Sequence, residues 1–298
     1  MKMKTRLIKI LAVTAVIIVA TFFGYRAAAC RITEEITFAT LESSDRESGI
    51  YVYDAKTENI HEIKLDGYSS LSFAAKCQNG GFFCVGTAES DKSINVIKVK
   101  SDKVEQAVAV HTKPDRLESF LDGVLMISDG KLIYLDFKSE KSYIVAENVY
   151  ETDGEYQIIS NGSKVIYRSG NKFFLLTLDS ENAFVENEIT DCAIPKDASL
   201  IAFADDRKLL LTDGNYKNYY YDIAENVLKN APSSYSFSKN DGLINNGKAA
   251  LCGYSDSALG SGVYIIDMKT GLKRKMKGDI SELYDSAYDF FWNSETGD

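Results

Sequence analysis

Short apolar runs separated by turn residues fill most of the chain after its first thirty or so residues. One such stretch, Ser48–Thr57 with the sequence SGIYVYDAKT, returns as Ser261–Thr270 with the sequence SGVYIIDMKT. Weaker copies lie between them, and on alignment to Asp54 the copies fall at positions 54, 100, 136, 179, 222 and 267. The gaps are 46, 36, 43, 43 and 45 residues. A repeat of this length, built from short strands, predicts a radial β-array.

The number of strands per unit predicts how the array closes. Units two to six each offer four strand-like runs, which is the strand number of a propeller blade. Unit one offers only three, Ile36–Leu41, Gly49–Asp54 and Asn59–Leu65, whereas a spare run lies near the C-terminus at Ser286–Trp292. We expect this run to supply the missing inner strand, because closure removes two sheet edges. The prediction is an all-β, six-bladed β-propeller; a seventh blade is the alternative, although too few residues remain for it.

Five of the six copies end their strand with an aspartate, at Asp54, Asp136, Asp179, Asp222 and Asp267. A carboxylate in this place can accept hydrogen bonds from the amides of the following turn. An acid repeated in five blades is a poor candidate for a single catalytic site. We therefore interpret these aspartates as turn formers. The second copy has Lys100 instead, with Asp102 two residues later.

The charge of the chain is distributed unevenly. The net charge is −9, yet the first 31 residues contain six cations and no acid, so the remainder holds 28 cations against 43 acids. A domain with this excess of acids repels phosphate backbones, which argues against nucleic-acid binding. The apolar content of 45% excludes a disordered chain.

The first residues resemble an export signal. Four cations at positions 2, 4, 6 and 9 precede an uncharged, mostly apolar run over residues 10–25. A helix over residues 7–25 would be about 28 Å long, which nearly spans the hydrocarbon core of a bilayer. Cations before such a run keep the N-terminus in the cytoplasm and send the following domain outside. We therefore expect a signal or anchor segment over residues 1–31 and a propeller domain over residues 32–298.

Three fates of this segment stay open. The helix over residues 7–25 can remain as a membrane anchor. Ala27 and Ala29 match the small residues of a signal-peptidase site, and cleavage after Ala29 would release a secreted domain. The sequence Ala27-Ala28-Ala29-Cys30 also resembles a lipoprotein cleavage box, in which Cys30 would carry the lipid, although Ala27 and the neighbouring Arg26 depart from that pattern. All three place the domain outside the cytoplasm.

No catalytic, cofactor-binding or metal-binding motif stands out. The chain has only two histidines, His61 and His111, both near expected outer strands, and we interpret them as surface residues. The four cysteines after Cys30 lack the spacing of a zinc site. Cys77 and Cys84 flank Gly80-Gly81; if these glycines form a two-residue turn, the cysteines lie opposite each other and could form a disulfide. We expect two buried thiols in preference to this disulfide.

The first and last units resemble a known family. Ile36-Thr37-Phe38 followed by Ser48–Asp54 and Thr57, and Lys248–Leu251 followed by Gly262–Gly271, are similar to the repeat of TolB-type, WD40-like bacterial propellers. The family's Ser-Pro-Asp-Gly turn is missing, and Ser238–Gly242 is its nearest remnant. The resemblance implies a six-bladed propeller of the bacterial envelope. Because members include both protein-binding components and non-catalytic domains of peptidases, function does not transfer with the fold.

The leading hypothesis for function is a non-enzymatic binding module at the outer face of a bacterial membrane. The expected partners are the membrane, through residues 7–25 or a lipid on Cys30, and another envelope protein, with a glycan or a peptide as alternatives. No cofactor is expected. One rival is a carbohydrate-active hydrolase or lyase that uses carboxylates or tyrosines at one mouth of the ring. Another is a structural or sensory ectodomain of an envelope complex.

Overall fold

The computed structural model describes residues 35–40, 48–147, 149, 157–170, 172–178, 183–189, 193–195, 197–215, 217–231, 237, 242–245, 248–256, 260–268, 270–277 and 287–293, together with residues 14, 21 and 24. Most of the expected anchor over residues 7–25, and both Ala29 and Cys30, lie outside these ranges. Within them, no helix is long and apolar enough to cross a membrane.

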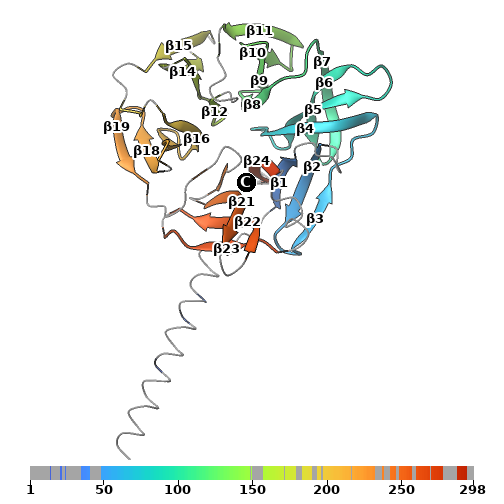
Figure 1. The fold of residues 1–298 in the computed structure, drawn as a ribbon. Helices are drawn as coiled ribbons and strands as arrows, with labels where there is room; N and C mark the ends of the chain where they lie inside the picture. Colours follow the sequence, from blue (N-terminus) through green and yellow to red (C-terminus); the bar gives the residue numbers. More distant parts are fainter. Residues whose placement is uncertain are drawn as a thin grey trace, which may run out of the picture.

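Six antiparallel sheets of four strands each form a ring, and the blades follow one another in chain order (Figure 1). Blade 1 contains β24 (Ala287–Asn293), β1 (Glu35–Thr40), β2 (Gly49–Asp54) and β3 (Asn59–Glu62). Blade 2 contains β4 (Tyr68–Lys76), β5 (Phe82–Ala88), β6 (Ile94–Lys100) and β7 (Lys103–Val110). Blade 3 contains β8 (Arg116–Phe120), β9 (Gly123–Ser128), β10 (Lys131–Asp136) and β11 (Lys141–Ala146).

The second half of the ring repeats this plan. Blade 4 contains β12 (Ile158–Ser160), β13 (Val165–Ser169), β14 (Lys172–Leu178) and β15 (Phe184–Glu188). Blade 5 contains β16 (Ser199–Phe203), β17 (Lys208–Thr212), β18 (Asn218–Asp222) and β19 (Val227–Asn230). Blade 6 contains β20 (Gly242–Asn245), β21 (Lys248–Asp256), β22 (Gly260–Asp267) and β23 (Lys273–Lys275). The prediction of a six-bladed, all-β propeller is confirmed.

The two ends of the propeller domain meet in blade 1. Strand β24 pairs antiparallel with β1, from Glu35 opposite Asn293 to Thr40 opposite Ala287. The C-terminal run therefore supplies the inner strand of the first blade, as the sequence predicts. Since β1 would otherwise be an open edge, this pairing fastens blade 6 to blade 1.

The core lies between neighbouring blades rather than inside any one of them. Ile50 and Val52 on β2 pack with Leu71 on β4 and Ile97 on β6, which joins blade 1 to blade 2. Similar clusters join each following pair up to blades 5 and 6. Strands that are covered on both faces need continuous apolar runs, and β9 is buried along its whole length. This is why β9, the second strand of blade 3, contains the continuous apolar run Val124–Ile127.

The aspartates that end the third strands form turns, as predicted. Asp54 accepts hydrogen bonds from the Lys56 amide at 2.7 Å and from the Thr57 hydroxyl at 2.7 Å. Asp136, Asp222 and Asp267 make equivalent bonds, whereas Asp179 lies outside the described residues. In blade 2, Lys100 pairs directly with Lys103 around a two-residue turn, in which Ser101 and Asp102 have φ values of 48° and 57°. Because this hairpin turn has only two residues, it lacks the additional turn amides that an aspartate at position 100 would cap.

Candidate functional site beside strand β4

The inner strand of blade 2 departs from regular geometry at two places. Between Ser69 and Ser72, and again between Ser72 and Ala75, β4 advances by three residues while β5 advances by two. These are β-bulges, and Ser70 and Phe73 within them have φ values of 52° and 56°. Residues other than glycine rarely adopt such angles, and they cluster where backbone groups are turned toward a new partner.

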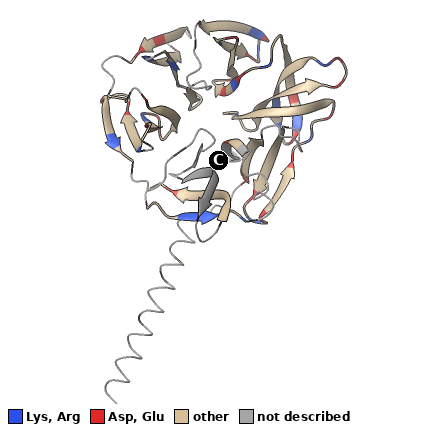
Figure 2. Ribbon diagram, viewed as in Figure 1, with Lys and Arg blue, Asp and Glu red and all other residues tan. Residues whose placement is uncertain are grey.

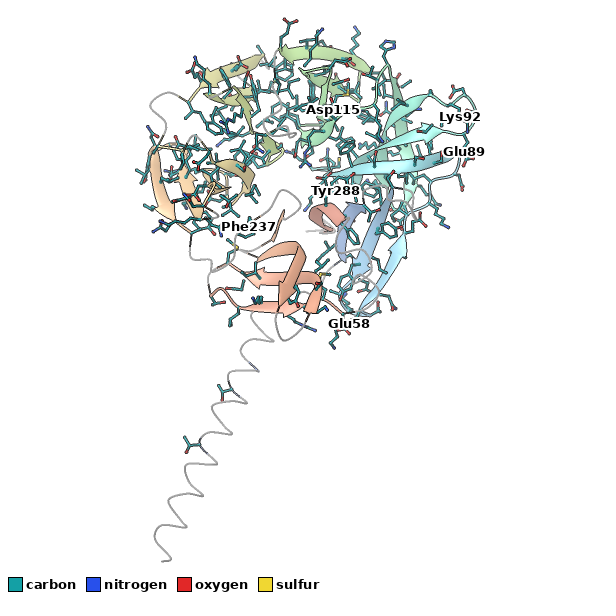
Figure 3. The ribbon with its side chains drawn as sticks, in the orientation of Figure 1. Glu58, Glu89, Lys92, Asp115, Phe237 and Tyr288 are labelled. Carbon is teal, nitrogen blue, oxygen red and sulfur yellow. The ribbon has the colours of Figure 1, made fainter. Side chains whose placement is uncertain are left out.

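The second bulge directs two backbone amides at the closing strand. The Phe73 amide donates to the hydroxyl of Tyr288 at 3.0 Å, and the Ala74 amide donates to the carboxylate of Asp289 at 3.3 Å. The rings of Phe73 and Tyr288 also meet edge to face, with centroids 6.0 Å apart. Asp289 has a φ of 53° and lies in a bulge of β24. Two matching irregularities therefore join blades 1 and 2 at the centre of the ring, where Figure 3 shows Tyr288.

Blade 3 completes the arrangement with an ion pair. Nη1 of Arg116 on β8 lies 2.8 Å from Asp289, and Nη2 lies 3.0 Å from Oε1 of Glu118. The side chains of Asp289, Glu118 and Arg116 are 4%, 16% and 28% exposed. Arg116, Glu118, Tyr288 and Asp289 thus form one group, the inner-ring cluster, in which a single cation serves two carboxylates.

The charge imbalance of the inner-ring cluster changes how its acids titrate. Burial, together with the nearby charge of Asp289, raises the pKa of Glu118 to about 7, although Arg116 acts in the opposite direction. Burial also raises the pKa of Asp289, again against the effect of Arg116, and it raises the pKa of the Tyr288 hydroxyl. An acid that titrates near neutrality is common at functional sites, and structural ion networks produce the same effect.

A cleft opens where β4 begins. It has a volume of about 390 Å³ and lies between the connection that leaves blade 1 and the β5–β6 turn of blade 2. Gly67, with a φ of 80°, is one of its lining residues, and the Gly67 carbonyl accepts a hydrogen bond from the Glu89 amide at 2.9 Å. Its lining consists of Ser48, Gly49, Glu62, Ile63, Lys64, Leu65, Asp66, Gly67, Tyr68, Ser69, Ser70, Leu71 and Glu89. Most of these residues are polar, and we call this feature the β4 cleft.

The residues named from the sequence fall elsewhere in the fold. His61 lies on the outer strand β3, 4.0 Å from Asp102, and His111 is exposed just after β7, so both are surface residues as predicted. Cys77 and Cys84 are free, buried thiols in separate core clusters. Lys76 pairs with Phe82, so the turn spans residues 77–81 and not Gly80-Gly81 alone. Because the turn is longer, Cys77 and Cys84 do not lie opposite each other, as a disulfide would require. Among the described residues, no three potential metal ligands gather.

The inner-ring cluster was not predicted from the sequence, although one sequence pattern indicates part of it. Arg116 and Glu118 flank the buried Leu117, so alternation along a strand puts both charges on one face of β8. Nothing in the sequence reveals the bulges that bring Asp289 to Arg116.

Solved structures share the fold of this chain, and the similarity shows the fold alone. No protein-family model and no curated protein sequence matches the chain. Among solved structures, TolB from Acinetobacter baumannii superimposes with a TM-score of 0.58 at 14% identity, over 88% of this chain and 67% of that one. A Lactobacillus plantarum protein gives a TM-score of 0.50 at 10% identity, over 88% and 100%. A chain of the nidogen/laminin complex gives 0.57 at 10%, over 88% and 99%.

These similarities show a β-propeller with the fold of TolB, as the repeat predicts. In all, 552 solved chains match, and a fold shared so widely hosts many unrelated functions.

Proposed function

We propose that this protein is a binding module, tethered to the outer side of a bacterial membrane, that holds another envelope protein in the β4 cleft. The observation that carries the proposal is the cleft itself, a concave and mostly polar opening of about 390 Å³ between blades 1 and 2. Binding sites favour such concavities on scaffolds that hold their shape. The nidogen/laminin structure offers an analogy, since a propeller of this shape occurs there in a protein complex.

The tether in this proposal is the N-terminal segment. Its basic start and the apolar stretch over residues 7–25 have the order of an export signal that keeps its cations in the cytoplasm. A retained helix and a lipid on Cys30 lead to the same attachment, whereas cleavage after Ala29 would leave the domain free. The strongly acidic charge of the propeller domain favours its solubility in water.

We expect the protein to lose its partner when two carboxylates of the β4 cleft are replaced by lysines. Membranes from cells that express the full chain are crosslinked and the chain is recovered, either as wild type or as the double variant Asp66→Lys/Glu89→Lys. Both carboxylates are exposed at the cleft. The control Glu147→Lys/Glu186→Lys makes the same change in charge on blades 3 and 4. Wild type and control should retain a specific partner that the cleft variant loses. Equal recovery by all three, or no specific partner, would contradict the proposal.

The inner-ring cluster favours a second candidate, a carbohydrate-active enzyme. Glu118, whose pKa is raised to about 7, and Asp289 both form ion pairs with Arg116. Most glycoside hydrolases use such a pair, an acid with a raised pKa and a second carboxylate. A screen of polysaccharides with wild type and Glu118→Gln distinguishes the two functions. Turnover that disappears in the variant would establish the enzyme.

A further inference from the structure

The β4 cleft opens on one face of the ring, and the chain enters the propeller on the other. Gly49, at the start of β2, lines the cleft together with the start of β4 and Glu89 of the β5–β6 turn (labelled in Figure 3). Glu35, the first residue of β1, pairs with Asp54 at the opposite end of β2. Strand β2 has six residues, so its two ends lie about 17 Å apart. The cleft is therefore open to a partner on the side away from the chain's entry.

Two carboxylates of the β4 cleft are free to bind a cation. The buried lining residues are apolar or glycine, and the charged lining residues are all exposed: Glu62, Lys64, Asp66 and Glu89. Lys64 lies 3.7 Å from Glu62, so the one cation of the lining already has an acid as its partner. Among the residues that the structure describes, none forms a hydrogen bond or an ion pair with the carboxylate of Asp66 or of Glu89. The cleft therefore presents two negative charges that no cation compensates.

The connecting segments around the cleft add acids rather than cations. The β5–β6 turn over residues 89–93 contains two acids and one cation, and the connection over residues 41–48, between β1 and β2, contains three acids and one cation. The connection that leaves blade 2, residues 111–115, contains one of each. Acids and cations are mixed over the blades in Figure 2, and after residue 31 the chain holds 43 acids against 28 cations. The charge of the domain and that of the cleft therefore attract the same kind of partner.

We infer that the β4 cleft binds a basic segment of the partner protein, whose lysine or arginine side chains pair with Asp66 and Glu89. The inference rests on the proposed function and names the chemistry of its partner. Hydrogen bonds between a cation and a carboxylate are stronger than those between neutral groups. The half-buried Tyr68 lines the same cleft, and a tyrosine ring attracts cations through its π-system. Because exposed charges are screened by salt, binding should weaken as ionic strength rises.

The test titrates a fluorescent six-lysine peptide into the full chain, held in non-ionic detergent at low salt, and measures anisotropy. The variant Asp66→Asn/Glu89→Gln keeps the shape of both side chains and removes both charges. It should bind the peptide roughly 3- to 30-fold more weakly than wild type. The control Glu147→Gln/Glu186→Gln removes two exposed charges from blades 3 and 4 and should bind like wild type. Equal affinity in all three proteins, or no binding to wild type, would overturn the inference.

The neutral variant also separates this inference from the proposed function. In the membrane crosslinking experiment described above, a basic partner should be lost from both Asp66→Lys/Glu89→Lys and Asp66→Asn/Glu89→Gln. A partner that the neutral variant retains and the lysine variant loses would overturn the inference and leave the cleft as the binding site. Retention by both variants would contradict the proposed function, and the peptide titration then decides alone whether the cleft binds basic segments.

Discussion

Arg116 is the residue on which the centre of the ring depends most. Its guanidinium contacts Asp289 from blade 1 and Glu118 from its own strand, and the same Asp289 accepts an amide of blade 2. A mostly buried ion network contributes little net stability when intact, yet loss of the only cation leaves carboxylates without compensation. The cluster therefore acts as a joint between three blades.

Replacement of Arg116 by methionine should be strongly destabilising. The variant should unfold with a free energy about 3 kcal/mol below that of wild type, since Glu118 and Asp289 lose their shared partner. Urea denaturation monitored by fluorescence measures the difference. The double variant Arg116→Met/Asp289→Asn should recover part of it. A single variant within about 0.5 kcal/mol of wild type would show that the network carries no such role.

The raised pKa of Glu118 gives stability a definite dependence on pH. The folded pKa of about 7 lies above the ordinary value of 4.5, so the folded state binds the proton more tightly than the unfolded state. Stability should therefore fall as pH rises between these values, by on the order of 2 kcal/mol from this group. Glu118→Gln should remove that loss and be more stable than wild type at pH 8. Denaturation curves at pH 5 and pH 8 measure this loss of stability. The exposed variant Glu147→Gln is the control. An identical pH dependence in all three proteins would contradict the assignment.

At the scale of elements, the repeat predicted most of the fold. Apolar runs and turn signals located the blades, and the spare run at Ser286–Trp292 identified β24 as the closing strand. The bulges were not predictable, because their positive φ values fall on Ser70, Phe73 and Asp289, none of them a glycine. The two-residue turn at Gly80-Gly81, on which a disulfide depended, does not form because the turn is longer, and Cys77 and Cys84 are the two buried thiols that the sequence favoured. Local sequence patterns predict strands well. They do not predict where a strand bends to contact a residue that is distant in the sequence.

Strand β24 should be indispensable for folding. Removal of residues 287–298 leaves β1 as an open edge and takes Tyr288 from the core between blades 1 and 2. The truncated chain should lose its cooperative unfolding transition and be cut rapidly by protease. Tyr288→Phe keeps the ring but leaves the Phe73 amide without its acceptor, so it should fold and lose roughly 1–2 kcal/mol. A truncated chain as protease-resistant as wild type would contradict closure by β24.

Two neighbouring glycines offer a matched comparison in the turn before β5. Gly80 and Gly81 both have positive φ values, 87° and 76°. A Cβ at Gly80 would meet nothing within 4 Å, whereas one at Gly81 would lie 2.0 Å from the Val99 carbonyl oxygen. Gly80→Ala should cost only the backbone strain of about 1–2 kcal/mol, and Gly81→Ala should cost clearly more. Thermal unfolding of the two variants gives the order, and equal losses would show that the turn shifts to admit the new side chain.

At the scale of the whole molecule, the fold provides a rigid ring with distinct surfaces. The inner-ring cluster holds three blades together, and the β4 cleft provides a concave surface between blades 1 and 2. The sequence predicted the ring, whereas its prediction of an export segment falls on residues that mostly lie outside the described ranges. It predicted neither the cleft nor the cluster, because both depend on residues from different blades. The fold alone identifies no partner, because one fold hosts many functions.

Site-specific photocrosslinking from the β4 cleft tests the binding proposal. A photoreactive phenylalanine analogue replaces Tyr68, which lines the cleft, or Tyr143, which is 44% exposed on the outer strand of blade 3. Irradiation of cells that express the full chain should give a discrete crosslinked product from position 68 and none from position 143. No product from position 68, or the same products from both positions, would contradict a partner held in the cleft.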